Sequence, residues 1–82
     1  MASPQRIIKA LSSVVKNTRR KRGLSQERLA LAADLNKNHI AKIEQCRTSA
    51  SLVVTFKIAE ALGLSASALT GQVESVLQGK KR

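Results

Sequence analysis

Apolar residues recur at intervals of three and four along most of the chain, which is the period of a helix with one buried face. In the first such segment, about residues 4–22, the residues that recur at this spacing are Ile7, Ile8, Leu11, Val14, Val15 and Thr18. Ser3 can cap this helix, Pro4 fits its first position, and Gly23 can end it in the left-handed conformation. No segment alternates with the two-residue period of a strand over a useful length.

Shorter helices are predicted along the rest of the chain. The second begins at Ser25 and ends near Asp34, and the third is capped by Asn36 and runs through Gln45. The fourth follows Ser51 and closes at Gly63, and the fifth is capped by Ser65, with a weak helical period continuing over residues 73–77. We therefore expect a single all-α domain, a compact bundle of about five short helices.

The amino-acid composition argues against several classes of protein. One Cys and one His cannot supply the four ligands of a structural zinc site or a disulfide framework. No apolar run approaches the ~20 residues that span a bilayer, and the first twenty residues have no signal-peptide core, so we expect a cytoplasmic protein without membrane contact. The sequence offers no carboxylate pair, nucleophile–base set or phosphate-binding glycine loop, so we expect no enzyme, cofactor or small-molecule substrate.

The chain is strongly basic, with fifteen Lys and Arg against five Asp and Glu and a net charge of +10. Residues 1–22 carry seven basic residues and no acid, residues 23–45 are balanced, and residues 46–82 are again basic. A solvated basic face is one interpretation, and nucleic acid is the other. Because base-stacking aromatics are absent except for one Phe, double-stranded DNA is favoured over single strands.

The neutral middle of the chain, about residues 25–45, predicts a helix-turn-helix. Its two helices are separated by little more than Leu35, so they must meet steeply, and the small residues Ala30 and Ala33 allow close approach. The second of these helices has a polar outer face of about the length that crosses a major groove. A generic helical hairpin is the alternative.

Four stretches together carry a family resemblance: RRKRGLSQ at residues 19–26, LA at 29–30, IAKIE at 40–44 and IAEALGLS at 58–65. With this spacing the chain resembles the lambdoid phage repressor and Cro family over about residues 11–70. The resemblance implies the lambda repressor-like fold and binding to double-stranded DNA. Size, charge and the short segment after Leu69 further resemble the controller proteins of restriction–modification systems.

Base reading is assigned to the third predicted helix. Lys37 and Asn38 lie in its first turn and Lys42 follows four to five residues later; Lys can donate to guanine and Asn can pair with adenine. One or two of them could instead contact phosphate only. Expected phosphate contacts, several of them implied by the resemblance, are Gln26, Asn36, His39, Gln45, Arg47, Thr48 and Ser49.

The resemblance also implies an ion pair between Arg19 and Glu44, although Arg19 could simply belong to the basic cluster of residues 19–22. The chain departs from the family pattern at three places. Asp34 stands where the family commonly has a turn glycine, Cys46 replaces a glycine, and Ala50–Ser51 replaces Asn-Pro. Cys46 is expected to be an unreactive surface thiol, with a redox switch as the alternative.

The resemblance places a dimer contact in the C-terminal segment, residues 64–78, through Leu64, Leu69, Val73, Val76 and Leu77. The alternative is that residues 73–77 fold back onto the first helix. The predicted function is a transcription regulator that binds a pseudo-palindromic operator as a homodimer, plausibly a restriction–modification controller. The competing hypotheses are an antitoxin or interaction module of a toxin–antitoxin pair, and a non-specific architectural DNA binder.

Overall fold

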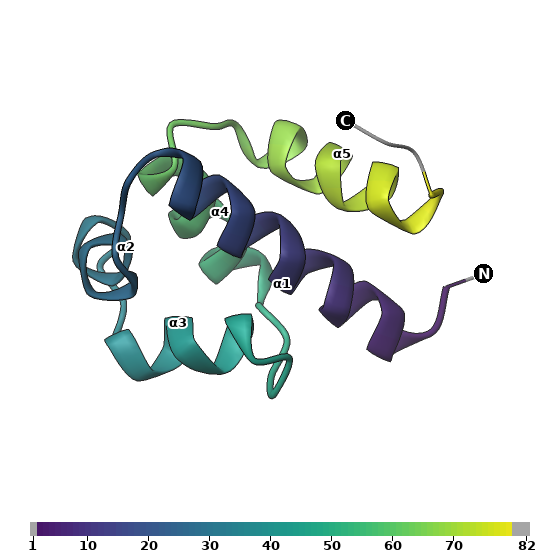
Figure 1. Ribbon diagram of the computed structural model, residues 1–82, viewed down its shortest axis with the longest axis horizontal. Coiled ribbons are helices and arrows are strands. Elements are labelled where there is room, and N and C mark those ends of the chain that lie inside the picture. The colour runs from purple at the N-terminus through teal and green to yellow at the C-terminus, as the bar shows by residue number, and fades with distance from the viewer. Residues whose placement is uncertain (1, 80–82) are drawn as a thin grey trace.

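The computed structural model describes residues 2–79 and contains five α-helices and no strand over that range (Figure 1). The helices are α1 (Pro4–Lys21), α2 (Gln26–Ala32), α3 (Lys37–Glu44), α4 (Leu52–Ala61) and α5 (Ala66–Leu77). The predicted all-α bundle is confirmed. The basic tail of Lys80, Lys81 and Arg82 lies outside the described residues.

Each helix begins at a polar cap whose side-chain oxygen accepts a backbone N–H that the helix itself cannot satisfy. The caps are Ser3, Ser25, Asn36, Ser51 and Ser65. After α1 the chain turns at Gly23, whose φ of 70° favours glycine. The last helix continues through Gly71 to Leu77, so the weak period of residues 73–77 is the second half of α5.

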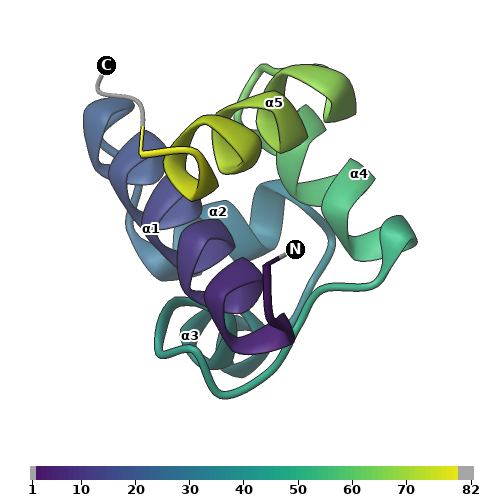
Figure 2. The same ribbon diagram turned by 90° about the vertical axis from the view of Figure 1, so that its right-hand side faces the viewer.

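One apolar core joins all five helices. Its fully buried side chains include Val15 of α1, Leu29 of α2, Ile40 of α3 and Ile58 of α4, with Leu69 from α5. Both views show α1 lying between α5 on one side and α3 on the other (Figures 1 and 2). The long helix α1 therefore packs against both α5 and α3.

The packing of α5 corrects one prediction. Leu69 is 0% exposed and Val73 is 8% exposed, because α5 lies along α1 (Figure 2). These two side chains belong to the core of a single copy and cannot form a dimer surface, so that part of the prediction is wrong. Leu64 and Leu77 are half-buried against the core, and Val76 is exposed. The alternative, in which this segment folds back onto the first helix, describes the structure.

No single helix within residues 2–79 is long and apolar enough to cross a membrane. Helices α4 and α5 reach the required length and composition only when taken together, and they meet at an angle of 101°.

Candidate nucleic-acid interface

The turn between α2 and α3 brings two short helices together. Ala30 and Ala33 are almost fully buried at the junction, where a larger side chain would separate the backbones. The backbone N–H of Leu35 donates to the carbonyl of Ala30 at 2.8 Å, and the half-buried Leu35 side chain packs against the core. Asp34 adopts a φ of 56°, the left-handed conformation that its position in the turn requires.

Helix α3 buries one side and presents the other to solvent. Ile40, Ile43 and Glu44 face inward, whereas Asn38, Lys42 and Gln45 are exposed. Residues four and seven apart share one helix face, so these three exposed side chains form a polar row along α3. The side chain of Asn36 accepts the N–H of Asn38 at 2.7 Å and thereby fixes the first turn.

Five of the predicted DNA-contacting residues lie together. Asn38, His39 and Lys42 of α3 line a shallow hollow of about 430 Å³ with the cap Asn36 and with Thr48 of the following loop. Lys37 is placed differently: it lines a separate hollow between α2 and α3 with Glu27, Arg28 and Leu31. Lys37, the remaining predicted base reader, is therefore exposed at the start of α3, on the side that faces α2.

The loop between α3 and α4, residues 45–51, begins with a second left-handed residue. Cys46 has a φ of 62°, and the next N–H, that of Arg47, donates to the carbonyl of Lys42 at 2.9 Å. Arg47 and Ser49 are exposed, and Cys46 is an exposed free thiol. The side chains predicted to contact phosphate in this loop thus lie at the C-terminal end of α3.

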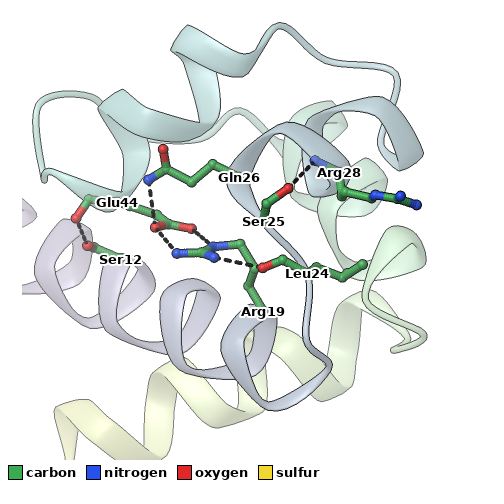
Figure 3. Close-up of polar contacts among 7 residues, drawn as sticks. All are labelled: Ser12, Arg19, Leu24, Ser25, Gln26, Arg28 and Glu44. Carbon is green, nitrogen blue, oxygen red and sulfur yellow. Dashed lines mark hydrogen bonds and ion pairs between the residues drawn. The ribbon is translucent and has the colours of Figure 1, made fainter.

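A buried polar cluster ties α3 to α1 (Figure 3). Arg19 donates through Nε to one carboxylate oxygen of Glu44 at 2.6 Å and through Nη2 to the other at 2.9 Å. Gln26 donates its side-chain amide to the same carboxylate at 3.0 Å, and Ser12 donates its hydroxyl to the Glu44 carbonyl at 2.6 Å. A further bond, from Arg19 to the carbonyl of Leu24 at 2.7 Å, holds the link that leads into α2.

These contacts shift both ionisable groups toward their charged forms. The hydrogen bond with Glu44 raises the pKa of Arg19, although burial opposes it. Burial alone would raise the pKa of Glu44, but hydrogen bonds from Arg19 and Gln26, with the nearby charges of Arg19 and Lys16, bring this pKa below its ordinary value. Glu44 is therefore a carboxylate at neutral pH, with its charge compensated inside the protein.

Sequence reasoning named the pair Arg19 and Glu44 but missed two of its partners. Ser12 lies seven residues before Arg19, so the two share one face of α1, and this spacing could have indicated a second contact with α3. Gln26 was assigned to phosphate alone, whereas its side chain is half-buried and bonded to Glu44. Its phosphate contact stays a prediction.

Among residues 2–79, no three His, Cys, Asp or Glu side chains lie close enough together to hold a metal ion. The chemistry of this surface is that of hydrogen-bond donors, amides and cations arranged around one exposed helix.

Comparison with protein families identifies the family to which this chain belongs. A family model described as helix-turn-helix matches residues 15–69, a range that contains the whole of α2 and α3. The chain belongs to the helix-turn-helix family. It is thus a DNA-binding regulator of this family.

Solved structures of other helix-turn-helix proteins share the fold. A mutant of the restriction-modification controller protein C.Esp1396I superposes with a TM-score of 0.84 at 22% identity, covering 99% of this chain and 100% of that one. The controller protein C.AhdI from Aeromonas hydrophila gives 0.73 at 29% identity, over 76% of this chain and 94% of that one. The clp gene regulator ClgR from Corynebacterium glutamicum gives 0.79 at 21% identity, over 89% and 80%. No curated protein matches the chain in a sequence search.

Proposed function

We propose that this helix-turn-helix protein is a sequence-specific transcription regulator that binds a pseudo-palindromic operator as a homodimer. The observation that carries the proposal is that Asn38 and Lys42 are exposed on one side of α3, a helix whose last residue is bound to α1 by Arg19. An exposed polar helix held in a fixed orientation can present the same donors and acceptors to successive bases.

Two kinds of contact are expected within this surface. Asn38 can pair with the N6 and N7 atoms of adenine, and Lys37 and Lys42 can donate to O6 and N7 of guanine. Arg47 supplies a guanidinium that binds a phosphate through two N–H groups, and Thr48 and Ser49 add hydroxyl donors in the same loop. Asn36, His39, Gln45 and Gln26 complete the proposed phosphate contacts. In this assignment α3 reads sequence while the loop fixes its register on the duplex.

One copy of α3 is too short to select an operator. Its eight residues span about 12 Å and face only a few base pairs. Two copies related by a two-fold axis, with their recognition helices about 34 Å apart, read two half-sites one helical turn apart. This requirement supports a dimer on a site of matching symmetry.

A role in a restriction–modification system is the more specific part of the proposal. It is supported by the likeness to C.AhdI, which is titled a restriction-modification controller protein, at 29% identity over 94% of that chain. We expect the regulated promoter, and with it the operator, to lie near the coding region of the protein itself. Activation or repression then depends on whether the operator lies beside or across the polymerase site.

The test is protection of DNA from nuclease by the full chain, using the segment upstream of its own coding region. The expected result is a two-fold-symmetric protected site that persists against an excess of unrelated DNA. Specific regulators bind their sites about 10³-fold or more tightly than random sequence. A ratio near one would contradict the proposal and favour a non-specific architectural protein.

A further inference from the structure

A row of positive charge follows α1 and takes no part in the proposed DNA interface. Arg6, Lys9, Ser13, Lys16 and Arg20 repeat at intervals of three and four residues, so they share one face of this helix. All of them are exposed except Lys16, which is half-buried. We call these five residues the α1 stripe. At a rise of about 1.5 Å per residue, the stripe is about 21 Å long.

The α1 stripe lies between the sides of α1 that contact α3 and α5. Ser12, the residue before Ser13, is turned by about 100° toward α3, where it donates to the carbonyl of Glu44 (Figure 3). Val14, the residue after Ser13, is turned the other way; it is buried and lines a hollow with Val76 of α5. Neither α3 nor α5 therefore covers the stripe.

The cations of the stripe have no acidic partner in the described part of the chain. Among residues 2–79 they form no ion pair, and α1 contains no acidic residue. Arg6 has one side-chain hydrogen bond, to the carbonyl of Leu77 at 3.3 Å. Like charges three and four residues apart destabilise a helix, and a cation in the first turn, such as Arg6, opposes the helix dipole. A face that served only solubility could mix both signs and avoid this cost.

We propose that the α1 stripe binds the phosphate backbone of a second segment of double-stranded DNA while α3 occupies the operator. The inference rests on the proposed function, because a protein must already be held on one segment in order to join it to another. It adds a bridging activity to that function. A regulator that holds both segments brings two distant parts of the same DNA together.

Charge and composition favour duplex DNA as the occupant. A duplex carries about one phosphate for every 1.7 Å of its axis, so about 21 Å of contact offers a phosphate to each of the four cations. The stripe contains no apolar or aromatic side chain. Protein partners are generally anchored by such side chains, and single strands stack their bases on aromatic rings. An acidic protein and a single strand therefore fit this surface less well.

The stripe faces a different direction from the exposed side of α3. Glu44 points toward α1, and Asn38, six residues earlier, lies about 120° around α3 from it, so Asn38 faces largely away from α1. The stripe itself is turned by about 100° from the direction of α3, as the step from Ser12 to Ser13 shows. A straight duplex on α3 therefore leaves the stripe open to a second one.

Capture of a second duplex by DNA-bound protein tests the proposal. A short duplex from the segment upstream of the protein's own coding region is immobilised and saturated with the full chain, and the excess is removed. A fluorescent duplex of unrelated sequence is then added. We expect it to bind, with an affinity that falls about 100-fold between about 50 and about 200 mM salt, because four phosphate contacts are lost to competing cations. Failure to capture it would overturn the proposal.

Ser13→Glu places a carboxylate at the centre of the stripe. The new side chain lies four residues after Lys9 and three before Lys16, spacings at which opposite charges stabilise a helix, so folding should be preserved. We expect capture of the second duplex to weaken at least about tenfold, and binding to the immobilised duplex to stay within about threefold of the wild-type value. Equal weakening of both would show that the stripe contacts the same duplex as α3, against the proposal.

Ser67→Glu is the matched control, because it makes the same change of charge at an exposed serine of α5. It should affect neither binding step, and circular dichroism verifies that both variants remain helical. Loss of capture to the same extent in Ser67→Glu and Ser13→Glu would mean that net charge, not the stripe, holds the second duplex.

Removal of two cations measures the number of phosphate contacts. Lys9→Gln combined with Arg20→Gln should change the slope of log K for capture against log salt from about −3.6 to about −1.8. Lys21→Gln combined with Arg22→Gln removes the same charge from exposed residues at the end of α1, outside the stripe, and should leave the slope unchanged. The same slope for both double variants would contradict the assignment.

A competitor identifies the kind of partner. Unlabelled duplex DNA should displace the fluorescent duplex at a lower concentration of charge than polyglutamate, and the reverse order would assign the stripe to an acidic protein. Nuclease protection of the upstream segment is measured separately. Capture that depends on Ser13 without a protected operator would refute the proposed function alone. A protected operator without capture would refute this inference alone.

Discussion

Arg19 and Glu44, twenty-five residues apart in the chain, meet through two parallel hydrogen bonds of 2.6 and 2.9 Å. Both side chains are largely withdrawn from solvent, with 10% and 1% of their surfaces exposed. Glu44 is the last residue of α3, and its carbonyl is also bound by Ser12 of α1. The orientation of α3 is therefore fixed by a buried charge pair as well as by apolar packing.

Removing one partner of this pair should be costly. Arg19→Ala leaves the Glu44 carboxylate buried without its guanidinium, and we expect the free energy of unfolding to fall by about 3 kcal/mol. Glu44→Ala should have a similar effect. The double variant should be less destabilised than the sum of the two, because no unpaired charge remains, and urea unfolding of all four proteins measures the coupling. Strict additivity would show that the two residues act independently.

The same pair should make stability depend on pH. Because the pKa of Glu44 is lower in the folded protein than the ordinary 4.5, its contribution is present in full above that value. It is lost as the pH falls from about 4.5 toward the folded pKa, where the carboxylate takes up a proton. We expect Glu44→Gln to remove part of the loss of stability that sets in as the pH falls below about 4.5. Glu74→Gln is the matched control, because it makes the same substitution at an exposed residue of α5.

Two strained positions flank α3, and each should gain stability on substitution by glycine. Asp34 and Cys46 have φ values of 56° and 62°, which L-residues other than Asn and Asp adopt at a cost of roughly 1–2 kcal/mol. Cys46→Gly should therefore raise the free energy of unfolding by about 0.5–1 kcal/mol, and Asp34→Gly by less, because Asp tolerates this conformation.

Gln78→Gly is the control for the effect of glycine itself. Gln78 caps α5 with an ordinary φ of −86°, so glycine should bring no relief there and should lower stability slightly. Thermal unfolding of the three variants distinguishes the relief of backbone strain at residues 34 and 46 from a general effect of glycine on stability. Equal changes at residues 46 and 78 would contradict the assigned strain at Cys46.

Much of this fold follows from local signals in the sequence. The N-caps Ser3, Ser25, Asn36 and Ser65 can be predicted directly from the sequence. A Ser or Asn just before a segment with helical apolar spacing indicates where a helix begins. The sequence marks Asp34 and Cys46 as departures from a family pattern, and both have a left-handed backbone, the conformation that favours glycine.

The sequence did not predict equally well which apolar residues would be buried. Leu69 and Leu52 are both leucines at helical spacing, yet Leu69 is 0% exposed and Leu52 is 72% exposed. The difference arises because α5 lies along α1, while the first turn of α4 has no described neighbour on its outer side. Periodicity gives the face of a helix but not the identity of the element that covers it.

Base readers and phosphate contacts should respond differently to truncation. Asn38→Ala and Lys42→Ala should weaken binding to the operator by about 1–3 kcal/mol each and change binding to random DNA much less. Arg47→Ala should weaken both by similar factors. Lys21→Ala, which removes an exposed cation at the end of α1, controls for net charge. Competition titrations supply the ratios, and an equal loss of discrimination at residues 42 and 47 would contradict the division.

Salt dependence measures how much of the positive charge meets the DNA. With two subunits each making about four phosphate contacts, the slope of log K against log salt concentration should be roughly −7. Arg47→Ala removes one phosphate contact from each subunit and should make the slope less negative by about 2, whereas Asn38→Ala should leave it unchanged, because a base contact releases no counterion. Binding isotherms at four or five salt concentrations give the three slopes. A wild-type slope shallower than about −3 would mean that few of the fifteen basic residues lie against phosphate. The same slope for all three proteins would remove Arg47 from the interface.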